Sequence, residues 1–142
     1  MKTLKSLFAA LALVVVCSVA KASDDADIAK LSKDNAITSY INAMTAGNMK
    51  GFNEVLDSTV KFSMLRGKDV VSFTKSDMLE FMNSNSGIKQ TCNTTATVVE
   101  NTGDVTVVKV DMQFKDFTRT NYVTVANTGK GWKITSVYSL FK

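Results

Sequence analysis

Side chains that could carry out acid–base or nucleophilic chemistry are scarce in this sequence. It has no histidine in 142 residues, and its two cysteines are Cys17 and Cys92. Without imidazole, a Ser-His-Asp or Cys-His nucleophile and a histidine-ligated zinc are excluded, and two cysteines cannot build a four-thiolate site. No two carboxylates have a spacing that demands a metal or paired acid–base work. We therefore predict no catalytic residues, no metal site and no cofactor, and we favour a protein that is not an enzyme.

One carboxylate could still act as a base. Residues 105–114 alternate, with Val110 and Met112 on one face of a strand and Lys109 and Asp111 on the other. Lys109 and Asp111 could form a pair inside a cavity, but the apolar face is the one that should contact the core. We therefore expect Asp111 to face solvent. An inward Asp111 would instead favour a lyase or isomerase with unfamiliar catalytic residues.

Changes in the hydrophobic period define the elements that must position any site. A helical period starts after Asp34, a candidate N-cap, and Gly47 is placed to end that helix. Thr74 and Asp77 are spaced like a capping box at the start of another helix. The first half should form a helix between 34 and 47, a short helix at 49–56, a hairpin of strands 60–65 and 69–73, and a helix from 74 that ends within 83–87. The second half should form four strands. The first of them ends at 99, and the other three span 105–114, 120–126 and 132–141.

Helices gathered ahead of a run of strands predict an α+β fold. We expect about three helices packed on one face of a strongly curved antiparallel sheet, because four consecutive hairpin-linked strands must twist and curl. No linker or repeat interrupts residues 34–142, so they should form one domain. A curled sheet that helices close leaves a cone, and such a cone is a common place for a small-molecule cavity.

The first 22 residues resemble an export signal. Lys2 and Lys5 precede the apolar run 7–20, and Ala20 and Ala22 supply the small residues of a cleavage site. The run is shorter than the roughly 20 residues that span a bilayer, so we expect no stable membrane anchor. We predict cleavage near Ala22, a periplasmic or secreted protein, and a flexible segment at 23–33. A retained anchor and a lipoprotein modified at Cys17 are the alternatives.

Removal of residues 1–22 would change the charge and the thiol content. Three lysines would leave, which lowers the net charge from +4 to +1. A nearly neutral domain with scattered lysines is not typical of nucleic-acid binding, so we predict no nucleic-acid partner. Cys92 would remain as the only thiol and could not form an internal disulfide.

Two stretches carry a family resemblance. Residues 36–62, AITSYINAMTAGNMKGFNEVLDSTVKF, resemble the opening of the nuclear transport factor 2-like superfamily, with an aromatic in the first helix and a break at Gly47-Asn48. The tail GKGWKITSVYSLF (129–141) is similar to that superfamily's last strand. Within that superfamily, this sequence resembles the exported bacterial members, the SnoaL-like and "putative lumazine-binding" groups. The resemblance implies the cone-shaped fold, but this fold hosts isomerases, dehydratases, hydrolases and scaffolds.

The ketosteroid isomerase branch of that superfamily gives a residue-level comparison. The resemblance places Tyr40 where that branch has a tyrosine that donates a hydrogen bond to the developing oxyanion. It places Phe62 where the branch has its general-base aspartate. Phenylalanine cannot accept a proton, so the group that proton abstraction requires is missing.

What remains is a largely apolar cavity, which Val110 and Ile134 would help to line. Trp132, Ile134 and Tyr138 share parity in the last strand and should therefore share a face. The predicted ligand-binding residues are Tyr40, Met44, Phe62, Met64, Met112, Trp132 and Tyr138.

The function that the sequence favours is an exported, non-enzymatic domain that binds a small apolar or aromatic molecule in the cone. The main alternative is a structural or interaction module whose cone is filled by its own side chains. Such a module would form a homodimer through a polar outer sheet face that contains Thr95, Thr97, Thr106 and Thr124.

Overall fold

The computed structural model describes residues 28–142. The predicted signal peptide at 1–22 lies outside the described residues, as does the beginning of the predicted flexible segment at 23–33. Contacts divide the chain into a unit that ends at Leu31 and a second unit, Ser32–Lys142, that holds the α+β fold. Within residues 28–142, no helix is long and apolar enough to cross a membrane. Export and cleavage near Ala22 stay predictions.

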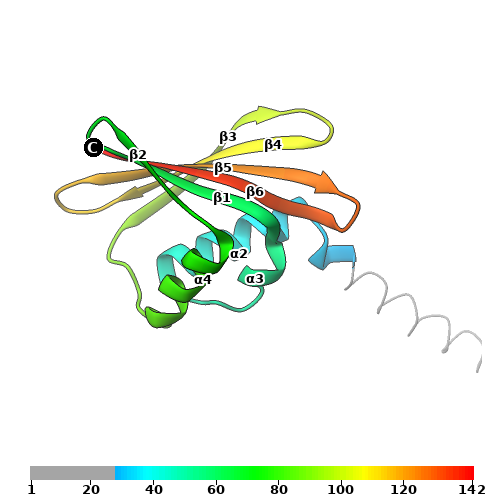
Figure 1. Ribbon diagram of the computed structural model, residues 1–142, viewed down its shortest axis with the longest axis horizontal. Helices are drawn as coiled ribbons and strands as arrows, with labels where there is room; N and C mark the ends of the chain where they lie inside the picture. Colours follow the sequence, from blue (N-terminus) through cyan, green and yellow to red (C-terminus); the bar gives the residue numbers. More distant parts are fainter. Residues whose placement is uncertain (1–27) are drawn as a thin grey trace, which may run out of the picture. The chain divides into compact units, whose positions relative to one another are not determined.

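The elements occur in the order that the sequence predicts (Figure 1). They are α2 (Lys33–Ala46), α3 (Phe52–Val55), β1 (Leu56–Arg66), β2 (Asp69–Phe73), α4 (Lys75–Ser84), β3 (Asn93–Asn101), β4 (Val105–Gln113), β5 (Thr118–Thr128) and β6 (Gly131–Phe141). Ser32, rather than Asp34, is the N-cap of α2, because the Ser32 hydroxyl accepts a hydrogen bond from the Asn35 amide at 3.1 Å. The predicted capping box of Thr74 and Asp77 is present at the start of α4.

The six strands form one open, mixed sheet in the order β2-β1-β6-β5-β4-β3. Strands β3 to β6 form the predicted antiparallel meander. Strand β1, however, lies parallel to β6, so the expectation of an all-antiparallel sheet was wrong at this pair. A hairpin fixes its two strands antiparallel, whereas no local turn sets the relative direction of two strands at opposite ends of the chain.

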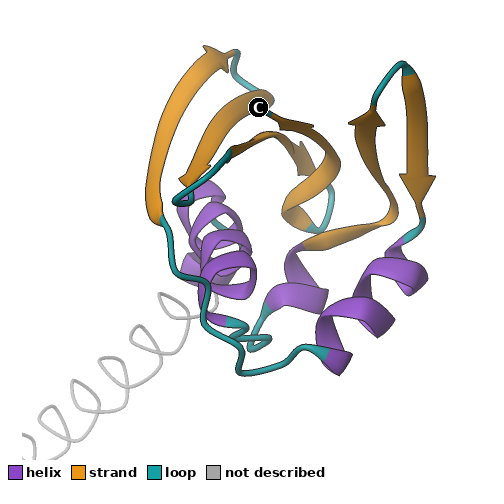
Figure 2. Cartoon of the chain, turned by 90° about the vertical axis from the view of Figure 1, so that its left-hand side faces the viewer, coloured by secondary structure: helices purple, strands orange, loops and turns teal. Residues whose placement is uncertain are grey.

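The three helices α2, α3 and α4 lie on one face of the sheet, which curves around them (Figures 1 and 2). Helix α2 packs against β5 and β6, and α4 packs against β1. The buried face of α2 repeats at helical spacing through Ala36, Tyr40, Ala43 and Met44. The concave face of the sheet completes the core with Val60, Phe62, Val108, Val110, Val123, Val125, Ile134 and Val137.

Gly47 allows the segment after α4 to dock on the end of α2. Its φ of 64° is left-handed, and its N–H donates to the Ala43 carbonyl at 3.1 Å. The Gly87 N–H donates to the Gly47 carbonyl at 3.0 Å, and the Gln90 N–H donates to the Thr45 carbonyl at 2.7 Å. A Cβ atom at position 47 would lie 2.7 Å from the Gly87 nitrogen, so only glycine permits this approach.

No helix of residues 32–142 covers the convex face of the sheet (Figure 1). Thr95, Thr97 and Thr124 belong to this face, because they pair with convex-face residues of β4. The expectation for Thr106 was wrong, because this residue is fully buried on the concave side and its hydroxyl donates to Asn101 Oδ1 at 2.9 Å. Homodimerisation through the convex face stays a prediction.

Candidate functional site

A cavity of about 820 Å³ lies between α4 and the concave face of the sheet. Apolar side chains dominate its wall, and we call it the methionine pocket. Its five methionines and four phenylalanines are Met44, Met64, Met78, Met82, Met112, Phe73, Phe81, Phe114 and Phe141. The methionines come from α2, α4, β1 and β4, so the pocket depends on the tertiary fold and not on a local motif.

Helix α4 forms one wall of this pocket through Met78 and Met82, which lie one turn apart. Two sets of hydrogen bonds hold the start of this helix in place. Asp77 Oδ2 accepts hydrogen bonds from the Thr74 N–H at 2.9 Å and the Thr74 hydroxyl at 2.8 Å, and these bonds lower the pKa of Asp77. Lys75 Nζ donates to the carbonyls of Asn53 at 3.1 Å and Leu56 at 3.0 Å. These contacts attach α4 to the junction of α3 and β1.

The structure brings three of the predicted ligand-binding residues, Met44, Met64 and Met112, together in the methionine pocket. Tyr40 and Phe62 do not line it, because both are buried in the adjoining core. Sequence reasoning did not include α4 in the wall, because the period of a helix does not show which part of a sheet it covers.

Trp132 and Tyr138 lie outside the pocket. The Trp132 ring lies under Lys33 Nζ, 5.2 Å from the ring centroid, near the start of α2. Tyr138 is 36% exposed and pairs with Ser63 and Tyr122 on the convex face. The parity argument for β6 was therefore wrong at Tyr138.

A β-bulge explains this error. Thr124 pairs with Ser136 but Val125 pairs with Ile134, which leaves Thr135 as an extra residue in β6. An extra residue reverses the faces of all residues beyond it. Ile134 and Val137 are consequently both buried, although they differ in parity.

A polar cluster at the concave face of β5 and β6 was not predicted. Arg119 lines the methionine pocket, and its Nε donates to Asn121 Oδ1 at 3.0 Å. The Ser139 hydroxyl donates to the same oxygen at 2.7 Å, and Asn121 Nδ2 donates to the Met112 sulfur at 3.7 Å. Asn121 and Ser139 are buried. The alternation of faces along β5 could have indicated this cluster, because Arg119 and Asn121 occupy the same face of the strand as its buried valines.

Tyr40 has an unusual environment in the core beside the pocket. Its ring is fully buried and lies 6.4 Å from the Phe52 ring, measured between centroids. Its hydroxyl has no hydrogen-bond partner among residues 28–142. Burial raises the pKa of Tyr40 to about 12, and the positive charge of Arg119 opposes this increase only in part. The hydroxyl is therefore held neutral and unpaired.

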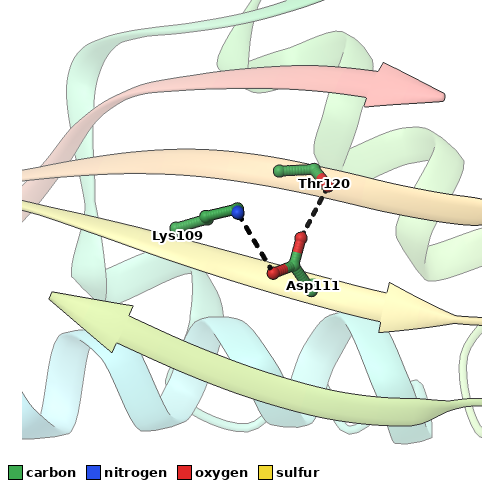
Figure 3. Close-up of polar contacts among 3 residues, drawn as sticks. All are labelled: Lys109, Asp111 and Thr120. Atoms are coloured by element: carbon green, nitrogen blue, oxygen red, sulfur yellow. Dashed lines mark hydrogen bonds and ion pairs between the residues drawn. The ribbon is translucent and has the colours of Figure 1, made fainter. Parts of the chain in front are cut away.

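Asp111 faces away from the pocket, on the convex side (Figure 3). Its Oδ2 lies 3.6 Å from Lys109 Nζ, and its Oδ1 accepts a hydrogen bond from the Thr120 hydroxyl at 2.6 Å. The carboxylates that line the pocket are Asp77 and Glu80, both on α4. Within residues 28–142, no group of three or more His, Cys, Asp and Glu side chains could hold a metal ion.

A second hollow, of about 990 Å³, lies between the loop that precedes β3 and the turn that joins β4 to β5. Most of the residues that line it are polar, among them Lys89, Gln90, Lys115, Asp116 and Lys142, and Phe114 and Phe117 also line it. Cys92 also lines it and contacts the Thr94 hydroxyl at 3.6 Å. Although this hollow is larger, it is more open, and it lacks the convergent apolar side chains that characterise small-molecule sites.

Comparison with known proteins agrees with this architecture. A family model described as "Putative lumazine-binding" matches residues 29–139. A nuclear transport factor 2-like protein of unknown function from Silicibacter pomeroyi aligns with a TM-score of 0.60 and 12% identity, over 77% of this chain and 92% of that chain. One from Methylobacillus flagellatus gives a TM-score of 0.59 and 16% identity, over 82% of this chain and 92% of that chain.

A further structure is described as a nuclear transport factor 2-like protein of unknown function in nutrient uptake, from Rhodospirillum rubrum. It aligns with a TM-score of 0.57 and 20% identity, over 77% of this chain and 97% of that chain. No curated protein matches this chain. At these identities the structural likeness shows the fold alone, and that fold is the nuclear transport factor 2-like fold that the sequence resemblance implied.

Proposed function

The chain belongs to the "Putative lumazine-binding" family, and we propose that it binds a small apolar or aromatic molecule in the methionine pocket. The convergence of methionines from four elements on one cavity carries this proposal. Methionine is flexible and polarisable, so it adapts to an irregular ligand and makes favourable contacts with aromatic rings. The four phenylalanines add flat surfaces for stacking. The family description makes flat heteroaromatic molecules of the lumazine class the first candidates.

We infer that the pocket binds its ligand without converting it. The sequence resemblance places Phe62 where the ketosteroid isomerase branch has its general base, and the sequence contains no histidine. Asp111, the strongest alternative base in the sequence, points to the convex face. Asp77, which does line the pocket, is held by Thr74, and its lowered pKa makes it a weaker base.

We also propose that the protein acts after export, in the periplasm or outside the cell. The charged start, apolar run and small residues of positions 1–22 support this location. The intact mass of protein recovered from an exporting host tests it. Loss of the first 22 residues agrees with the proposal, and full-length protein retained in the cytoplasm contradicts it.

Fluorescence titration with N-phenyl-1-naphthylamine tests the proposed binding. This dye is neutral and aromatic, and its emission rises in apolar surroundings. We expect saturable binding of one dye per chain, and competition by lumazine would identify the preferred ligand class. Absence of a saturable increase, in a sample whose near-ultraviolet circular dichroism shows a folded domain, would overturn the proposal.

A further inference from the structure

Arg119 is the one positively charged residue among the described residues that line the methionine pocket, whose wall is mainly apolar. In the β-sheet register, Arg119 pairs with Met112 on β4 and with Phe141 on β6, and all three residues line the pocket. Its guanidinium carbon lies 5.6 Å from the centre of the Phe141 ring. Arg119 is half-buried, and its side chain lies on the concave face of the sheet.

The Arg119 guanidinium is held at one edge and unpaired at the other. Its Nε donates to Asn121, whose oxygen is fixed by a second hydrogen bond from Ser139. Among residues 28–142, its terminal nitrogens have no hydrogen-bond acceptor, and no carboxylate lies within 4.0 Å of them. The planar guanidinium fork matches carboxylate and sulfonate oxygens, and a weakly polar environment strengthens such pairs.

We propose that the ligand of the methionine pocket carries an anionic group, such as a carboxylate or sulfonate, and that this group pairs with Arg119. The inference rests on the proposed binding function. Asn121 is a positioning residue, because it occupies the Nε edge and leaves the terminal nitrogens for the ligand.

The other charges of the pocket wall set the ligand's orientation. Asp77 and Glu80 lie on α4, whereas Arg119 lies on β5. An anionic group would be repelled by the carboxylates and attracted by the guanidinium. The ligand should therefore bind with its charged end at the sheet and its apolar body between Met78 and Met82 of α4 and Met64 of β1.

Two dyes with the same aromatic framework test this inference. N-Phenyl-1-naphthylamine is neutral, and 8-anilinonaphthalene-1-sulfonate adds one sulfonate to that framework. We expect the wild-type protein to bind the sulfonate more tightly. Arg119→Gln should lower the affinity for the sulfonate dye by about 10- to 100-fold, because a hydrogen-bonded charge pair is lost. Its affinity for the neutral dye should fall by much less, because that dye has no anionic group that loses a partner.

Arg119→Lys serves as the conservative variant. Lysine keeps the charge but loses the planar fork, so we expect its affinity for the sulfonate to lie between those of wild type and Arg119→Gln. The wild-type ratio of the two affinities remains informative even if Arg119→Gln does not fold. Circular dichroism establishes whether each variant is folded.

The outcomes separate the two proposals. If the neutral dye binds but the sulfonate binds no tighter, or if Arg119→Gln weakens both dyes equally, the anionic-ligand inference is wrong and the binding function stands. If neither dye binds folded wild-type protein, the binding function itself is overturned. If Arg119→Gln selectively loses affinity for the sulfonate dye and Arg119→Lys retains part of it, both the binding function and the anionic-ligand inference are supported.

Discussion

Replacement of Met64 by tryptophan is expected to abolish dye binding and leave the domain folded. Met64 lies on β1, is only half-buried and lines the methionine pocket. The larger indole would occupy space that the ligand needs. Because the pocket is empty of protein atoms, the indole can be accommodated with little overpacking of the core. We expect affinity for N-phenyl-1-naphthylamine to fall by at least about 100-fold, which is roughly 3 kcal/mol of binding free energy.

Lys61→Trp is the matched control for this variant. Lys61 lies on the same strand, is exposed, and pairs with Ser136 on the convex face. The same indole is thereby added outside the pocket, and dye affinity should remain at the wild-type level. Equal affinities in the two variants would show that the dye binds elsewhere. Thermal unfolding of both variants checks that the comparison concerns folded protein.

Tyr40→Phe is expected to make stability less sensitive to alkaline pH. The pKa of Tyr40 is about 12 in the folded state, against about 10 in an unfolded chain. Because folding raises this pKa, the stabilisation is fully present below pH 10 and is lost as pH rises through about 12. The wild-type free energy of unfolding should therefore fall, relative to that of the variant, by about 1.4 kcal/mol per pH unit between about pH 10 and pH 12.

Urea unfolding of wild type and Tyr40→Phe at a series of pH values measures this difference. The two proteins share every other side chain, so contributions from the rest of the chain cancel when the two curves are subtracted. Near pH 7 the variant should be at least as stable as wild type, since it removes a buried hydroxyl that has no partner. Parallel curves up to pH 12 would mean that the Tyr40 hydroxyl is not buried as described.

Local signals in the sequence were sufficient for much of the fold. The alternation in β4 predicted the outward position of Asp111 and the inward position of Met112, because this strand has no bulge. The capping box at Thr74 was predictable, because it depends on residues three positions apart. The parallel pairing of β1 with β6 was not predictable in this way, because it joins distant segments.

The candidate site was less accessible to sequence reasoning. The bulge at Thr135 moved Tyr138 to the convex face, and no residue type in that segment signals a bulge. Met78 and Met82 enter the pocket only because α4 packs over β1. Arg119 could have been noticed as a charged residue at a core-facing position, but its proximity to the methionines depends on the sheet register.

The methyl groups of the methionines can show directly whether the methionine pocket is the ligand site. Of the seven methionines in the sequence, five line the pocket, whereas Met49 packs elsewhere against the core and provides an internal control. We would label the methionine methyl groups with carbon-13 and record their NMR spectra during titration with N-phenyl-1-naphthylamine. We predict ring-current shifts for Met44, Met64, Met78, Met82 and Met112, with Met49 unchanged. Saturable dye binding that leaves these five signals in place would contradict this prediction.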